Sequence, residues 1–498
     1  MKRLGFRLAR WGFVGLPCLG LACAEIGNNQ RMPTANPAAY PTSPGPAADS
    51  AFGVRLSPEP IPHEVKKCPQ LPLSLDAVFR LAEQNNPQMA VATAKVAAAF
   101  AEKELADNNW IPDIYLGVGY WRHDGGIQLQ EGQLIRSDTQ AMLAGPQISA
   151  TFNPHDRAFR QLSAARQVWQ SQGDLTKITS EQLLEAASTY IDVLAAYSAM
   201  GVSRDYEKSL KELEARVNKA IAAIGKAADL EIELARIQGE LTTQQFTQQK
   251  LRATLDSLSA KLAYLLGVDP TTHVLPEEKT IEAFHIVDVS QPADALVSQA
   301  LTNGPGIKEI EGILWVIQDG MAKAEGPARF LPEFNFLAGE GVFGAGPNNT
   351  MNYANRFDMG VQARWNITNV FSAEHKRQVA CTQMSQAQWT YHELRQKLTL
   401  GVQEARNTIV ASGGLFAKSE EQIREAKKVV ALNEKRLEFR EKTGATYGDV
   451  MLSHKAVSMA QLGYIDLLRE FDKAELRLMI LLGPGAPACR MELPCSQK

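Results

Sequence analysis

The chain has 498 residues, a formal net charge of −3 and 21% charged residues. Its length predicts about three domains with a large buried core. The slightly acidic balance excludes a nucleic-acid binder that relies on a broad basic surface. Six cysteines are too few for a fold built on disulfides.

Residues 1–24 have the pattern of an export signal peptide. Basic residues precede an apolar run from Trp11 to Ala22, which is too short to cross a bilayer as a helix. The following residues allow cleavage after Ala24, and Cys23 is an alternative site for lipidation. The pattern predicts a protein that leaves the cytoplasm, and no later stretch is apolar for long enough to predict a transmembrane helix.

Residues 25–72 are rich in Pro, Ala, Asn and Ser and hold 10 of the 25 prolines of the chain. No hydrophobic period is visible there. This composition is typical of an extended, poorly ordered tether.

Two long stretches, 155–269 and 348–483, contain no proline. Because proline costs about 3 kcal/mol inside a helix, such stretches permit very long helices. Apolar residues recur there at steps of three and four, as in the seam of a coiled coil: Leu183, Ala187, Tyr190, Leu194 and Tyr197; Leu210, Leu213, Val217, Ala220 and Ile224; Leu394, Leu398, Val402, Ala405 and Ile409. The pattern predicts a helix over about 156–224, roughly 100 Å long, with an interruption at Gly201. A second long helix continues to about Lys442.

The two halves of the chain repeat each other. Three motifs recur at a distance near 217 residues: Val78, Ala82, Asn85 and Pro87 as Leu296, Ala300, Asn303 and Pro305; residues 110–113 as 330–333; and residues 265–267 as 481–483. Each Leu-Leu-Gly triplet ends a long helix with Gly at a C-cap position. The repetition divides the chain into repeat 1 (73–290), repeat 2 (291–485) and a tail (486–498).

Each repeat also contains two stretches with the two-residue period of a β-strand. Apolar and polar residues alternate over 114–121, 147–152, 333–336 and 357–365, and the residues between them, 122–145 and 344–356, are interpreted as polar loops. A half-buried soluble sheet would explain this pattern. A transmembrane barrel with lipid outside and water inside would explain it too, because about 9–11 residues suffice for a tilted strand.

The order of helix, hairpin and two long helices, present twice, resembles the TolC-like outer membrane efflux protein family. The residues that carry the resemblance are the opening motif of repeat 1 (Leu75, Asp76, Leu81, Ala82 and Asn85-Asn86-Pro87), its end at Leu265-Leu266-Gly267, and the end of repeat 2 with Gly444, Asp449-Val450 and Leu482-Gly483. The resemblance covers about residues 73–484. No single motif is decisive, and the duplicated order carries most of the weight.

The resemblance implies a mainly α fold with a β-barrel. Long coiled-coil helices would form a periplasmic α-barrel, and four strands per chain would form a 12-stranded transmembrane barrel in a homotrimer. It implies a passive exit duct in the outer membrane, with a long periplasmic extension. Its partners would be a periplasmic adaptor, an inner-membrane transporter of a tripartite efflux pump or type I secretion system, and outer membrane lipid. The alternative is a periplasmic or surface-anchored coiled-coil structural protein without a transport role.

The resemblance also suggests candidate residues for the periplasmic aperture. Asp449 follows the turn at Gly444, where the family narrows its duct, and a ring of three carboxylates would attract cations. Ser453 is the other candidate for the constriction, in which case Asp449 would contact the adaptor. Asp229 begins the matching helix of repeat 1 with Glu231 and Glu233, and favourable charge at a helix N-terminus also explains these acids.

No pattern in the sequence predicts an enzyme, a cofactor or a metal site. The segment 339–344 matches the Gly-x-Gly-x-x-Gly fingerprint, but a turn follows it where nucleotide binding needs a helix. His375 and His392 are interpreted as solvated positions on a long helix. Cys489 and Cys495 could form a local disulfide, with Cys68 as a rival partner and free thiols as the simplest alternative.

Overall fold

The computed structural model describes residues 70–483, apart from 109–110, 129–131, 225–227, 279, 326–330, 348–349, 366 and 440–442. The predicted signal peptide, nearly all of the segment 25–72 and the tail 486–498 lie outside the described residues. The same holds for Cys23, Cys68, Cys489 and Cys495, so their lipidation and disulfide state stay predictions. Cys381 is described and is present as a thiol.

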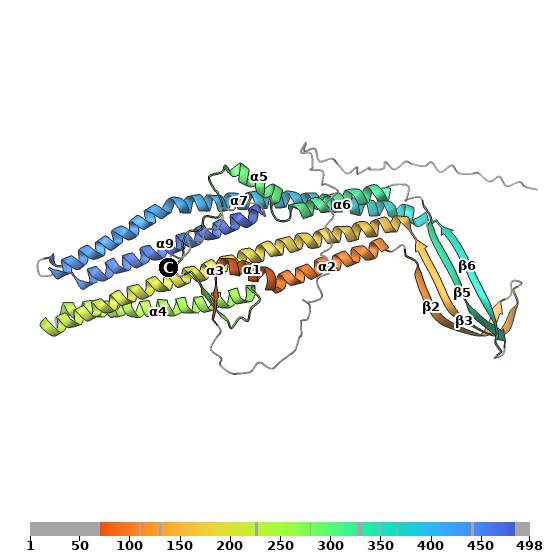
Figure 1. The fold of residues 1–498 in the computed structure, drawn as a ribbon, viewed down its shortest axis with the longest axis horizontal. Helices are drawn as coiled ribbons and strands as arrows, with labels where there is room; N and C mark the ends of the chain where they lie inside the picture. The colour runs from red at the N-terminus through yellow and green to blue at the C-terminus, as the bar shows by residue number, and fades with distance from the viewer. Residues whose placement is uncertain are drawn as a thin grey trace, which may run out of the picture.

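The molecule is elongated, with long helices along one axis and a four-stranded sheet at one end (Figure 1). Repeat 1 contains α1 (Leu75–Asn85), α2 (Pro87–Asn108), β2 (Asp113–Gln128), β3 (Leu134–Phe152), α3 (Pro154–Ile224) and α4 (Ala228–Leu265). Repeat 2 contains α5 (Ala293–Asn303), α6 (Ile307–Glu325), β5 (Glu333–Pro347), β6 (Asn352–Arg364), α7 (Ile367–Glu438) and α9 (Tyr447–Leu482). The predicted order of elements is confirmed. In addition, two short strands, β1 (Gln70–Leu73) and β4 (His273–Pro276), pair in parallel.

The predicted long helices are α3, with 71 residues, and α7, with 72. The seam residues Ala187, Tyr190 and Leu194 are fully buried, as the three-and-four spacing predicts. The expected interruption at Gly201 is wrong, because α3 continues through it. None of the helices in the described ranges is long and apolar enough to cross a membrane.

The duplicated Asn and Leu-Leu-Gly motifs meet at equivalent contacts in the two repeats. Gly267, at φ +65°, packs on the backbone carbonyl of Asn85, and Gly483, at φ +73°, packs in the same way on that of Asn303. Next to the first contact, the buried amide of Asn86 donates to the Leu265 carbonyl at 3.0 Å. The repeated sequence signature is therefore one structural joint, between the end of a long helix and the start of its repeat.

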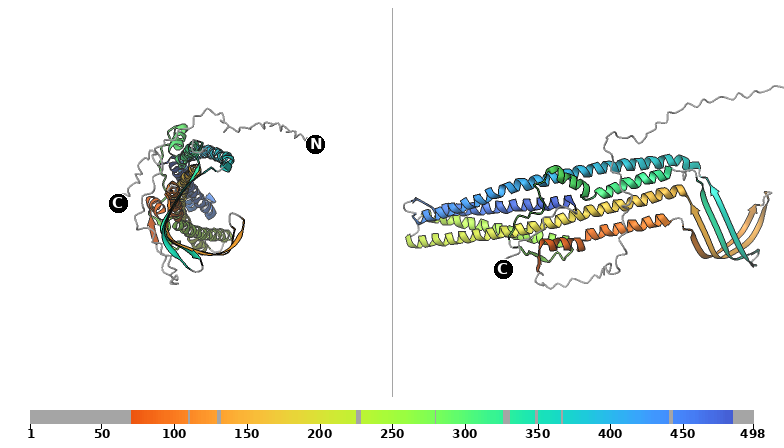
Figure 2. Two further views of the ribbon diagram at one scale, coloured as in Figure 1. Left: turned by 90° about the vertical axis from the view of Figure 1, so that its right-hand side faces the viewer. Right: turned by 45° about the horizontal axis from the view of Figure 1, so that its top comes forward.

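The two hairpins form one antiparallel sheet in the order β2-β3-β5-β6. The register places Ile114 opposite Ile148 and Val118 opposite Ala144, so the apolar residues of neighbouring strands share one face. The alternation predicted from the sequence is thus confirmed. The sheet turns away from the helix axis, as a second view shows (Figure 2).

The strands are longer than expected, at 13 to 19 residues. Most of the segments 122–145 and 344–356, interpreted from the sequence as loops, belong to strands in the structure. In the extended part of the first hairpin, Arg122 lies 3.7 Å from Asp138 and Arg136 lies 3.7 Å from Asp124. These charged residues lie on the same face of the sheet as the apolar residues between Ile114 and Tyr120. The alternation of apolar and polar residues therefore ends there, although the strand pairing continues.

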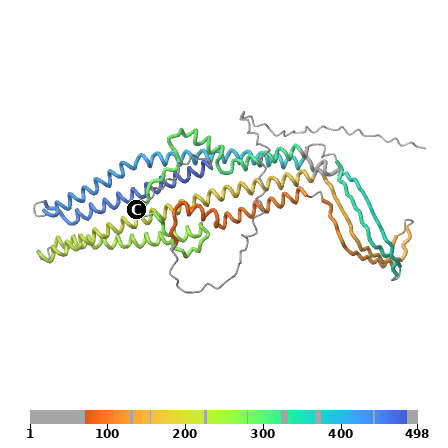
Figure 3. The backbone as a smooth tube through the Cα atoms, in the orientation of Figure 1, coloured from red at the N-terminus to blue at the C-terminus, as the bar shows by residue number. Residues whose placement is uncertain are grey.

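The two repeats share one large hydrophobic core in the middle of the helical region. It combines side chains from α1, α3 and the end of α4 with side chains from α5, α7 and α9. The tube drawing shows the helices of the two repeats as two layers along the molecule (Figure 3). At the end opposite the sheet lie the last residues of α3 and α7 and the first residues of α4 and α9, and these helix ends form the helical tip (Figure 1).

Candidate functional site

The helical tip contains the three residues that the sequence suggested for an aperture. On the repeat 2 side, the chain passes through Gly444, at φ +64°, and enters α9 at Tyr447. A left-handed conformation of this kind favours glycine because other residues clash there. The Gly444 turn thus directs the chain back along α7.

Asp449 completes a capping box at the start of α9. The Thr446 hydroxyl accepts from the Asp449 N–H at 3.1 Å, and the Asp449 carboxylate accepts from the Thr446 N–H at 3.0 Å. This reciprocal pair satisfies two donors that a helix N-terminus leaves unpaired. The half-buried Asp449 therefore has a structural role that the sequence interpretation did not assign to it.

Ser453 and Asp229 occupy different environments from Asp449. Ser453 is 4% exposed, and its hydroxyl donates to the Val450 carbonyl at 2.7 Å, within α9. This burial argues against Ser453 as a lining residue of an aperture. Asp229 is exposed in the first turn of α4, which suits favourable interaction with the helix dipole.

Glu233 is the residue at the tip whose role the sequence did not reveal. It is 6% exposed on α4, and its carboxylate accepts from the backbone N–H of Tyr447 at 3.1 Å. A carboxylate of repeat 1 thus caps the first residue of a helix in repeat 2. Its position in the buried stripe of α4 was a visible signal, because Leu230, Glu233, Ile237 and Leu241 follow at steps of three and four.

Polar contacts continue away from the tip and tie the long helices together. Lys455 of α9 lies 2.9 Å from the Glu240 carboxylate of α4, and the buried Tyr206 of α3 donates to the same carboxylate at 3.1 Å. Burial and the nearby Glu240 raise the pKa of Tyr206 above its ordinary value. The phenol therefore stays protonated and keeps donating.

A second ionic cluster lies between α3, α7 and α9. The Glu434 carboxylate lies 3.8 Å from Nε2 of His454 and 3.9 Å from Arg216. Burial lowers the pKa of His454 below its ordinary value, and Glu434 opposes this shift. Both clusters cross the boundary between the repeats, so they couple the long helices of repeat 1 to those of repeat 2 near the tip.

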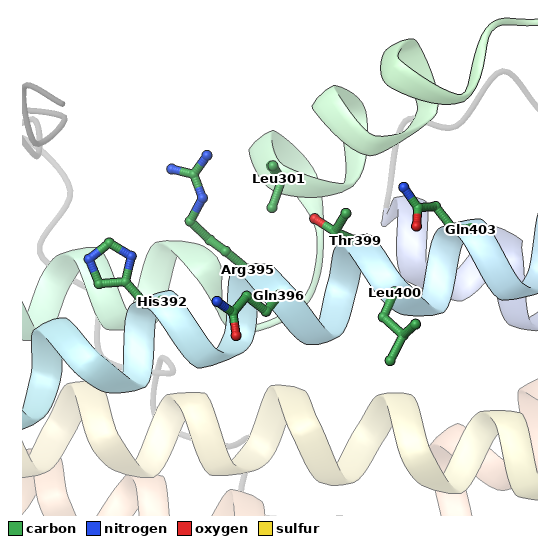
Figure 4. Close-up of a pocket in the computed structure, with 7 residues that line it drawn as sticks. All are labelled: Leu301, His392, Arg395, Gln396, Thr399, Leu400 and Gln403. Carbon is green, nitrogen blue, oxygen red and sulfur yellow. The ribbon is translucent and has the colours of Figure 1, made fainter. Parts of the chain in front are cut away.

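An open groove of about 350 Å³ lies farther along the helices, between α5 and α7 (Figure 4). Its lining includes Leu301 of α5 and His392 and Arg395 of α7. Arg395 donates to the Tyr391 hydroxyl at 3.2 Å. His392 and His375 are exposed on α7, as predicted, and nothing in the groove resembles a catalytic arrangement.

Other chemistry considered from the sequence is not assembled in the described part of the chain. The glycine-rich segment 339–344 runs inside β5 and leads to β6, so it does not open a helix as nucleotide binding requires. The described residues contain no group of three or more His, Cys, Asp or Glu side chains placed to hold a metal ion.

The capping box leads to a stability prediction for Asp449→Ala. Loss of this cap is expected to destabilise the first turn of α9 by about 0.5–2 kcal/mol, more than a substitution in an exposed turn would. Hydrogen exchange of the amides of Val450 and Met451 measures the effect. Asp229→Ala, at the matching but exposed position of α4, is the control and should change local stability by less than about 0.5 kcal/mol. Equal effects of the two substitutions would contradict the capping role.

Comparison with solved structures identifies the fold. No family model and no curated protein matches the chain. The chain is similar to the CmeC outer membrane channel of Campylobacter jejuni, at 14% identity and a TM-score of 0.67 over 82% of this chain and 85% of that one. It is similar to the outer membrane protein VceC of Vibrio cholerae, at 15% identity and a TM-score of 0.65 over 82% and 96% of the two chains. It is also similar to the open MtrE outer membrane channel of Neisseria gonorrhoeae, at 14% identity and a TM-score of 0.60 over 83% and 89%. The expected likeness to TolC-like outer membrane channels is thus confirmed at the level of the fold.

Proposed function

We propose that this protein is a trimeric channel-tunnel of the outer membrane and the passive exit duct of a tripartite efflux pump or type I secretion system. The main support for the proposal comes from the four-stranded sheet. It has one exposed apolar face and two unpaired edges, and it lies at the end of helices long enough to extend far into the periplasm. The likeness to the CmeC, VceC and MtrE channels supports the same conclusion.

The apolar face of the sheet has the chemistry of a lipid-facing surface. Its members are Ile114, Leu116, Val118, Tyr120, Met142, Ala144, Ile148, Ala150, Phe152, Phe334, Phe336, Ala338, Val342, Phe357, Met359 and Val361. Leu116 is 85% exposed and Val118 is 71% exposed. One carboxylate, Glu340, interrupts this face opposite Phe357. Apolar exposure of this extent is costly in water and favourable in lipid.

The height of the apolar face suits a membrane. Phe152 and Met142 mark its ends on β3, and the ten residue-to-residue steps between them, at ~3.4 Å each and tilted by ~40°, span about 26 Å. A transmembrane barrel presents an apolar band about 25 Å tall. Beyond Tyr120 the same face carries the ion pairs Arg122–Asp138 and Arg136–Asp124, which suits the level where lipid gives way to water.

The opposite face of the sheet is suited to water. It carries Ser149, Gln147 and Thr151 on β3, and two ion pairs, Glu333–Arg364 at 3.3 Å and Arg356–Asp358 at 2.7 Å. Polar residues line the interior of membrane barrels that conduct solutes. This face would therefore line the duct.

The two edge strands of the sheet support the association of several chains. β2 and β6 are its outer strands, and unpaired strand edges cannot remain in hydrocarbon because their backbone groups lack partners there. Four strands are also too few to close a barrel by themselves. Three chains would close a barrel of 12 strands, with β6 of each chain beside β2 of the next.

The alternative hypothesis is a periplasmic or surface-anchored coiled-coil protein whose sheet is exposed to water. The exposed apolar face argues against it. No enzyme activity or cofactor is proposed. The cargo would be selected by an inner-membrane transporter, reached through a periplasmic adaptor.

Measuring the oligomeric state distinguishes the proposed channel from the coiled-coil alternative. Sedimentation of the detergent-extracted protein should show one species of three chains, and outer-membrane fractions should contain a heat-modifiable trimer. In planar bilayers this species should conduct ions without added nucleotide. A well-behaved folded monomer that does not insert into membranes would support the coiled-coil alternative.

A further inference from the structure

The connector between the repeats, residues 277–292, is anchored to α9 by two buried carboxylates. Asp472 is fully buried, and one of its oxygens accepts from the Phe284 N–H at 2.8 Å. Glu475 is 1% exposed and accepts from the N–H groups of Ile286 at 3.3 Å and Val287 at 2.9 Å. Three backbone donors of the connector thus end on two neighbouring acids of one helix.

The second oxygen of Asp472, Oδ2, is buried without a hydrogen-bond partner among the described residues. A buried carboxylate with an unpaired oxygen is costly, whereas a protonated carboxyl can donate from that position. Burial, with a smaller contribution from the neighbouring Glu475, raises the pKa of Asp472 to about 8 against the opposing hydrogen bond from the Phe284 N–H. Burial also raises the pKa of Glu475. Two acids this close and this buried cannot both ionise easily.

The charged groups around the pair do not supply a buried counter-ion. On the connector, His285 acts on Glu475 but is itself exposed, with its ring against Phe471. On α3, Asp192 is engaged by Lys473 at 2.6 Å and by Arg469 at 3.8 Å. On α7, Glu404 pairs with Arg477 at 3.0 Å, and Arg406 is half-buried. A proton is therefore the simplest way to neutralise the pair.

We propose that Asp472 and Glu475 form a proton-dependent clasp, which holds the connector on α9 while the pair carries a proton and loosens as the pH rises. The clasp joins the polypeptide link between the repeats to the last long helix of the chain. Its release would free the connector from α9 without unfolding either repeat, because the helices of the two repeats also pack on each other directly. The proposal does not depend on the channel role.

The direction of the pH effect follows from linkage. The clasped state binds the proton more tightly than a locally opened state, in which Asp472 has its ordinary pKa. Clasp stability is therefore greatest in acid, falls as the pH rises from about 4 toward 8, and is constant above that. Over the steep part, protection of the connector amides should fall by about tenfold per pH unit.

Hydrogen exchange on the full-length protein in detergent tests the clasp. After correction for intrinsic exchange rates, the amides of Phe284, Ile286 and Val287 should lose about a hundredfold in protection between pH 5.5 and 7.5. The amide of Ile237, in the seam between α3 and α4, should not follow this trend. Protection of the connector that is independent of pH in the unmodified protein would overturn the proposal.

The variant Asp472→Asn tests whether the proton on Asp472 causes the pH dependence. Asparagine keeps an acceptor for the Phe284 N–H and supplies a permanent donor in place of the protonated oxygen, so the pH dependence that Asp472 causes should be lost and only the part due to Glu475 should remain. Asp466→Asn, on the same helix with its side chain 70% exposed, is the matched control and should keep the unmodified pH profile. A full pH dependence that persists in Asp472→Asn would also overturn the proposal.

Discussion

Val118→Arg is expected to abolish assembly of the proposed trimeric barrel. Val118 lies on the apolar face of the sheet, opposite Ala144, and is 71% exposed in the single chain. Arginine on the lipid face near the bilayer midplane costs roughly 2–4 kcal/mol, and a trimer would incur this cost three times. The heat-modifiable trimer in outer-membrane fractions should disappear.

Ser149→Arg is the matched control on the opposite face. Ser149 pairs with Asp113 across β2 and β3, so a new guanidinium there would lie beside a carboxylate on the face that is proposed to line the duct. Trimer yield should stay close to that of the unmodified protein, while single-channel conductance changes. Equal assembly of both arginine variants would mean that the two faces of the sheet do not face lipid and water, respectively. The proposal of a transmembrane barrel would then be wrong.

The fold was predictable from the sequence in the segments where apolar residues recur with a regular period. Such a period arises when one side of a helix or strand lies in a different environment from the other side. The seam residues of α3 and α7 separate a helix interface from solvent, and the alternation around Val118 separates two faces of a sheet. Above Tyr120 both faces of the hairpin carry polar residues, such as Arg122 on one face and His123 on the other, so the period vanishes. Backbone pairing needs no such contrast, which is why the strands extend beyond the pattern.

The candidate site was predictable only in part, because the contacts between its two repeats join segments more than 200 residues apart. Asp449 follows the Gly444 turn and forms a capping box with Thr446 inside one turn, and its role in an aperture stays a prediction. Glu233 meets Tyr447 across the two repeats. No local pattern places these two residues together, and the same is true of Asp472 and the connector.

Gly267→Ala is expected to be among the most destabilising substitutions in the helical region. Gly267 has φ +65°, and a Cβ atom there would lie 2.2 Å from the carbonyl oxygen of Asn85. Left-handed strain and the collision with rigid backbone each cost about 1–3 kcal/mol, so the loss should be at least about 2 kcal/mol. Gly483→Ala should behave alike, since its Cβ would lie 2.1 Å from the Asn303 oxygen.

Gly201→Ala provides the control for the same chemical change. Gly201 lies inside α3, and a Cβ atom added there meets nothing within 4 Å. Alanine is a better helix former than glycine by about 0.5–1 kcal/mol, so this variant should be as stable as the unmodified protein or more so. Thermal unfolding followed by circular dichroism at one protein concentration compares the three variants. The duplicated joint explains the recurrence of Asn and Leu-Leu-Gly only if Gly267→Ala and Gly483→Ala both lower the midpoint while Gly201→Ala does not.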